Sequence, residues 1–355
     1  MNKFVLTVLF IGLNFISFCQ KYDIDLELKT KYGFLIAHRA IMSHIPKDHT
    51  KAFELNIVVQ TNSSKSWHGE LKQAKIGFSF VGTSVGNKEL MGNLFGSYLF
   101  LQFPFIKSKK NFLYGKAGTG IGFAPKVFHQ QNDPKNIAIS THINALINFG
   151  LFYQHHFKKT YFNVGLDLTH FSNGAAKMPN LGINLPYLAC ALGYHFQQSK
   201  NEINFRDKVP LMKDWNFLVI GIASFKEDYP TNGNKYPIFA SSFLGQKLFS
   251  HKLGYETGLD FMYKSAINNY KPEIYKPKES LFQIGYYNGY LLTLDRLQVA
   301  IGLGIYIKDE YNADNYFYNR LGLRYYLNNK FFINFTLKSH WAKADYIEYG
   351  MGIRF

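Results

Sequence analysis

The sequence predicts an all-β protein, a transmembrane antiparallel β-barrel of about 16 strands. Segments of about ten residues alternate between apolar and polar side chains along the chain, which is the period of strands with two different faces. Beyond residue 19 no stretch approaches the roughly twenty apolar residues that a membrane-spanning helix needs. Backbone groups in hydrocarbon must all be paired within the protein, so exported membrane strands are expected to close into a barrel.

The N-terminus predicts a secretory signal peptide over residues 1–19. Lys3 precedes an apolar run over 4–18 that is too short to cross a bilayer as a helix. Cleavage before Gln20 fits this segment, and lipidation of Cys19 is the alternative. If cleavage removes Cys19, only Cys190 remains, so no intramolecular disulfide is expected.

Strands are expected in two groups of eight, separated by the polar segment 197–213. They lie near 23–36, 51–62, 73–83, 89–105, 111–124, 138–156, 160–172 and 184–196, and then near 214–226, 236–248, 251–264, 279–291, 295–308, 315–326, 329–339 and 345–355. The expected organisation is therefore an eight-strand half over 20–196, a connecting segment over 197–213 and a second eight-strand half over 214–355. Its final strand ends EYGMGIRF, whose terminal Phe355 resembles the signal read by the outer-membrane assembly machinery. One continuous barrel of sixteen strands is favoured because that signal is stronger at Phe355 than at Phe196; the alternative is two eight-stranded barrels.

Loops and charge favour a membrane surface over nucleic acid as the partner. Long polar segments such as HRAIMSHIPKDHTK and KVFHQQNDPKN alternate with short ones such as FKKT, the asymmetry of outer-membrane barrels. The formal charge of +16 is spread over the chain without a basic run, which suits the phosphates of lipopolysaccharide; a charged surface that only keeps the protein soluble is the alternative explanation.

The strand over 160–172 places two reactive side chains on its lipid-facing side. In YFNVGLDLTHFS the even positions are apolar up to Leu168, whereas odd positions such as Asn163 and Asp167 are polar or small. His170 and Ser172 continue the even face, so both should emerge outside the barrel. At this spacing an imidazole can reach a hydroxyl, as a base must to activate a serine.

Residues 168–196, LTHFSNGAAKMPNLGINLPYLACALGYHF, resemble the lipid A 3-O-deacylase family (PagL type). The resemblance extends over about 20–196 and implies a Gram-negative outer-membrane serine esterase that removes the 3-O-linked acyl chain of lipid A, with no cofactor. It implies that His170 is the catalytic base and Ser172 the nucleophile. Asn173 would be an oxyanion donor, with the backbone amide near Gly174 as a second donor. Asn180 belongs to the same spacing, and turn chemistry is the alternative role for Asn173 and Asn180.

The third member of the site departs from the family. The family has a Glu fourteen residues after the His, and here that position is Asn184. An Asn can orient a neutral imidazole but cannot offset the charge of an imidazolium. Asp167, expected to face the lumen, and Asp133, in another loop, are the alternatives.

A non-catalytic barrel, porin-like or structural, is the rival to the esterase. No spacing of His, Cys and carboxylates indicates a metal site. In the second half His340 aligns with His170 at an offset of 170, but Ala342 stands where Ser172 would be. The apolar odd positions around His340 place its side chain in the lumen.

Overall fold

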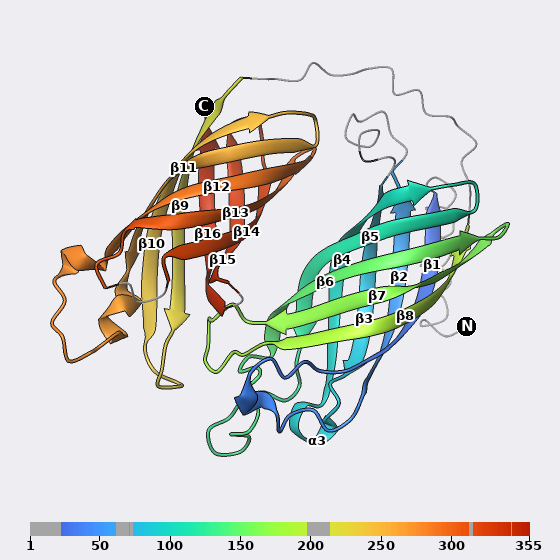
Figure 1. The fold of residues 1–355 in the computed structure, drawn as a ribbon, viewed down its shortest axis with the longest axis horizontal. Coiled ribbons are helices and arrows are strands. Elements are labelled where there is room, and N and C mark those ends of the chain that lie inside the picture. Colours follow the sequence, from blue (N-terminus) through green and yellow to red (C-terminus); the bar gives the residue numbers. More distant parts are fainter. Residues whose placement is uncertain (1–22, 62–70, 72–73, 197–213, 312–314, 342) are drawn as a thin grey trace, which may run out of the picture. The chain divides into compact units, whose positions relative to one another are not determined.

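The computed structural model describes residues 23–61, 71, 74–196, 214–311, 315–341 and 343–355 (Figure 1). These residues form two compact units, each a closed barrel. The expected signal peptide (1–19) and connecting segment (197–213) lie outside the described residues. Among the described residues, no helix has both the length and the apolar character to cross a membrane.

The first barrel consists of eight antiparallel strands in chain order. They are β1 (Ile24–Gly33), β2 (Thr50–Gln60), β3 (Lys75–Ser84), β4 (Asn93–Lys107), β5 (Asn111–Phe123), β6 (Ile143–His156), β7 (Thr160–Ser172) and β8 (Ile183–His195). The barrel closes where β1 pairs with β8, with Leu28 opposite Leu192.

The second barrel repeats this arrangement within its own half of the chain. Its strands are β9 (Asn216–Glu227), β10 (Lys235–Leu248), β11 (Leu253–Lys264), β12 (Phe282–Leu294), β13 (Leu297–Lys308), β14 (Phe317–Tyr326), β15 (Phe331–His340) and β16 (Lys343–Arg354). Here β16 pairs with β9, with Met351 opposite Gly221.

The expectation of one continuous sixteen-stranded barrel is therefore wrong, and the alternative of two eight-stranded barrels is correct. Once β1 pairs with β8, the first half has no free sheet edge left to pair with β9. Eight strands also give an interior that side chains can just fill.

The expected strand positions agree with the structure, with two notable differences at their starts. The strand expected from residue 89 begins at Asn93, because α3 (Lys88–Met91) occupies its start; the Asn87 side chain caps this helix by accepting a hydrogen bond from the Leu90 amide. The strand expected from residue 138 begins at Ile143. In the described part of the chain, three short 3-10 helices lie in connections: η1 (Ala40–Met42), η2 (Ser265–Asn269) and η3 (Lys278–Leu281).

Side chains alternate between an apolar outer face and a polar interior. On β7, Leu166 is 64% exposed, whereas Asn163 and Asp167 are buried. On β8, Leu188 and Leu192 are likewise exposed. The outward apolar face predicted from the alternation is confirmed.

Paired charges fill the interior of the first barrel. Lys116 on β5 donates a hydrogen bond to Glu54 on β2 at 2.6 Å, and these strands are not neighbours, so the contact crosses the lumen. Lys31 forms ion pairs with Glu54 and, at 2.8 Å, with Asp167. All four side chains are fully buried or nearly so. Buried charges require such pairing, since an unpaired ion in a low-dielectric interior is costly.

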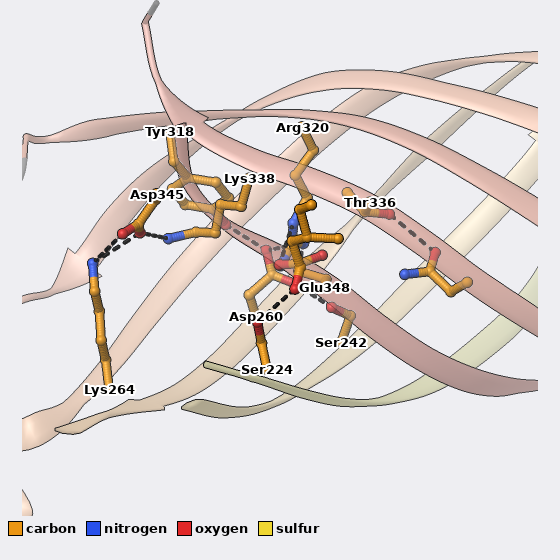
Figure 2. Close-up of polar contacts among 12 residues, drawn as sticks. Ser224, Ser242, Asp260, Lys264, Tyr318, Arg320, Thr336, Lys338, Asp345 and Glu348 are labelled. Atoms are coloured by element: carbon orange, nitrogen blue, oxygen red, sulfur yellow. Dashed lines mark hydrogen bonds and ion pairs between the residues drawn. The ribbon is translucent and has the colours of Figure 1, made fainter. Parts of the chain in front are cut away.

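The second barrel is filled in the same way (Figure 2). Arg320 on β14 donates two hydrogen bonds of 2.7 Å to Asp260 on β11, and a third of 2.7 Å to Glu348 on β16. Asp345 on β16 accepts from Lys264 on β11 at 2.8 Å. Within the described residues, both lumens are thus packed with ion pairs.

Candidate active site

His170 and Ser172 lie at the end of β7 and are hydrogen-bonded to each other. The distance from His170 Nε2 to Ser172 Oγ is 2.9 Å. The alternation on β7 places both residues on the face that carries exposed Leu166 and Leu168, as the sequence predicted. The imidazole and the hydroxyl are therefore within the reach required for proton transfer.

Asn184 on β8 lies directly opposite His170. The antiparallel register pairs the two residues, and His170 Nδ1 is 2.7 Å from Asn184 Oδ1. Asn184, expected from its place fourteen residues after His170, therefore lies beside the imidazole. Because an amide oxygen only accepts, His170 carries its proton on Nδ1, which leaves Nε2 free to accept the Ser172 proton.

A glycine allows the chain to pass close to the imidazole. Gly182 precedes β8 with a φ of +80°, and a Cβ added there would lie 3.0 Å from His170 Cε1. Its amide donates to the Ala138 carbonyl at 2.9 Å. Both the left-handed backbone and the lack of a side chain are therefore needed at this position.

His38 is a member of the site that was not predicted from the sequence. Beyond β1, the Ile36 amide donates to the Asn184 carbonyl at 3.0 Å, so the chain continues alongside β8. This brings His38 to Asn184, whose Nδ2 lies 3.3 Å from His38 Nδ1. His38 belongs to no motif; the only signal would have been an extension of the pairing between β1 and β8.

The loop after Ser172 is organised by turn hydrogen bonds. The Asn173 amide donates to Asn180 Oδ1 at 3.1 Å, and the Asn173 side chain donates to the Lys177 carbonyl at 2.9 Å. Gly174 has a φ of +63°. These bonds are those of a structured turn, and the oxyanion roles of Asn173 and Gly174 remain predictions.

The two carboxylates weighed against Asn184 lie elsewhere. Asp167 faces the lumen, where it accepts from Lys31 and Asn148, each at 2.8 Å. Asp133 forms a backbone bridge with His129 in the connection between β5 and β6. Neither is in a position that competes with Asn184.

The second barrel uses its aligned histidine differently. His340 is 5% exposed and lies 3.0 Å from the Tyr306 hydroxyl in the lumen, so its predicted inward orientation is confirmed. Ala342, which aligns with Ser172, lies outside the described residues. Across the described ranges, no group of three or more His, Cys, Asp and Glu side chains is placed to hold a metal ion.

These features define a class of protein, a closed eight-stranded barrel with a serine and a histidine hydrogen-bonded on its outer face. Residues 51–194 match the family described as lipid A 3-O-deacylase (PagL). Residues 213–355 match the family described as the C-terminal domain of acyloxyacyl hydrolase. Residues 51–194, which include most of the first barrel, therefore belong to the lipid A 3-O-deacylase (PagL) family.

Solved structures resemble the chain only distantly. The crystal structure of the outer membrane enzyme PagL is 13% identical, covering 46% of this chain and 97% of its own, with a TM-score of 0.32. A porin variant from Rh. blastica is 7% identical, and the match covers 94% of this chain and 99% of the porin, with a TM-score of 0.18. CdiB from Acinetobacter baumannii is 11% identical, and the match covers 94% of this chain and 60% of CdiB, with a TM-score of 0.19. Likenesses this weak carry no argument about function. No curated protein matches the chain significantly.

Proposed function

We propose that this protein is an outer-membrane serine esterase that removes the 3-O-linked acyl chain of lipid A. The observation that carries the proposal is the line of hydrogen bonds from Ser172 through His170 to Asn184 on the outward face of β7 and β8. The family membership of residues 51–194 supports the choice of lipid A as substrate. A lipid ester would meet this face, whereas a soluble substrate in the lumen would not.

The geometry supports acyl transfer through the serine. Ser172 Oγ attacks the ester carbonyl while His170 Nε2 takes its proton and then delivers it to the leaving 3-hydroxyl. Asn184 holds the imidazole with its proton on Nδ1. Water then releases the acyl chain, again with His170 as the base. Asn173 and the Gly174 amide are proposed as oxyanion donors, each contributing about 3 to 4 kcal/mol.

The outer membrane of a Gram-negative bacterium is the proposed location. Exposed leucines on β7 and β8 would face hydrocarbon. The site lies at the strand ends that carry the long connections, such as the one between β1 and β2. Loops of this length usually face outward, which would place His170 at the level of lipopolysaccharide. The outer-membrane assembly machinery is proposed as the partner that inserts the barrels.

The test is to measure, by mass spectrometry, the mass of lipid A from cells that express the protein. Wild type should produce lipid A lacking one hydroxyacyl chain, and Ser172→Ala at equal expression should leave lipid A intact. Glu89→Gln, at an exposed side chain of α3, is a control that should behave as wild type. Unchanged lipid A in wild-type cells would favour the rival of a structural barrel.

The filled lumens disfavour the alternative that this protein is a porin-like channel. Lys116 and Glu54 in the first barrel, and Arg320 and Asp260 in the second, join strands across the interior. An aqueous pore needs an interior much wider than eight strands provide.

A further inference from the structure

The replacement of a carboxylate by Asn184 creates a problem of orientation. Both oxygens of a carboxylate accept hydrogen bonds, so either one can receive the proton on His170 Nδ1. An amide has one acceptor and one donor, and it works only with its oxygen toward the imidazole. Turned by 180°, Asn184 would donate to Nδ1, and the ring would carry its proton on Nε2. Such an imidazole could not accept the proton of Ser172.

A neighbouring histidine supplies the missing orientation. Asn184 Nδ2 lies 3.3 Å from His38 Nδ1, while Asn184 Oδ1 is 2.7 Å from His170 Nδ1. A neutral His38 with its proton on Nε2 offers a lone pair at Nδ1, which accepts from the amide nitrogen. Hydrogen bonds then run in one direction, from Ser172 to His170, on to Asn184 and finally to His38.

We propose that His38 is a positioning residue that fixes the amide of Asn184 and thereby the proton of the catalytic imidazole. The inference rests on the proposed esterase function. His38 is needed because Asn184 is an amide with one correct orientation. A Glu at position 184 would not need His38 to orient it. The backbone bond from Ile36 to Asn184 places His38 for this contact.

The test uses the full-length protein in detergent and measures kcat and KM for acyl release from lipid A. His38→Ala removes the acceptor and should lower kcat by about tenfold, with little change in KM. His38→Asp keeps an acceptor atom on Cγ, the same position as Nδ1, and should stay within about twofold of wild type. His44→Ala is the matched control, because His44 lies in the same connection but bonds to the Lys135 carbonyl.

Repeating His38→Ala in a protein that carries Asn184→Glu distinguishes positioning of the Asn184 amide from a merely structural role of His38 in its loop. In Asn184→Glu, adding His38→Ala should change kcat by less than about twofold, because a carboxylate has no wrong orientation. The inference is overturned if His38→Ala costs the same factor in both backgrounds, if it costs nothing with Asn184, or if His38→Asp falls as far as His38→Ala. A wild-type protein that releases no acyl chain would overturn the proposed function, and this inference with it. Wild-type activity that His38→Ala leaves intact would overturn this inference alone.

Discussion

Leu166→Arg tests whether the apolar outer face of the first barrel lies in hydrocarbon. Leu166 is 64% exposed and lies six residues from Thr160, where β7 begins. At about 3.3 Å per residue and a tilt of about 40°, this separation corresponds to a depth of roughly 15 Å, near the middle of a hydrophobic band about 25 Å tall. An Arg there should lower the free energy of unfolding by about 2 to 4 kcal/mol.

Thr160→Arg is the matched control on the same face of the same strand. Thr160 is exposed at the strand end, where a membrane interface would lie, and the cost of an Arg there should be about 0 to 1 kcal/mol. Both variants are refolded into phospholipid vesicles and titrated with urea, with the folded fraction read from heat-modifiable mobility on gels. Equal costs for Leu166→Arg and Thr160→Arg would refute the assignment of this face to lipid.

Gly182→Ala should slow ester hydrolysis by about tenfold to a hundredfold, because small displacements at a reacting centre are costly and the added Cβ would crowd His170. Gly221→Ala, whose Cβ meets nothing within 4 Å, should leave the rate unchanged; equal rates for the two would contradict the crowding. Glu54→Gln should lower the free energy of unfolding in urea titration by about 3 to 5 kcal/mol, since it leaves buried lysines without their carboxylate. Glu89→Gln, in an exposed ion pair, should lower it by less than about 1 kcal/mol, and a similarly small value for Glu54→Gln would count against the packed lumen. In planar bilayers the protein should show no stepwise conductance, and stable open steps would contradict two filled lumens.

Strand positions and faces could be predicted because both depend on local alternation. In β7 the polar residues Asn163 and Asp167 lie inside and Leu166 outside, as a period of two dictates. The pair of strands that closes each barrel could not be predicted from local alternation. Whether β8 pairs with β1 or continues to β9 depends on residues far apart in sequence, such as Leu28 and Leu192, and alternation is the same in either case.

The candidate site shows the same division between local and distant contacts. His170 and Ser172 were predicted from a short motif on one strand face, and Asn184 from its place fourteen residues after His170. His38 is 146 residues from Asn184, and only the extension of the pairing beyond β1 brings it there. Likewise, the sequence indicated polar lumen positions, but the pairing of Lys116 with Glu54 depends on strands that meet only across the barrel.

The central claim is that His170 activates Ser172 as a nucleophile on the outer face of the first barrel. A fluorophosphonate with a lipid-like chain reacts covalently with activated serines, and peptide mass mapping locates the adduct in the purified full-length protein. We predict one equivalent of label on Ser172, and its loss in both Ser172→Ala and His170→Ala. An unlabelled wild-type protein, or equal labelling of Ser172 without His170, would contradict the claim.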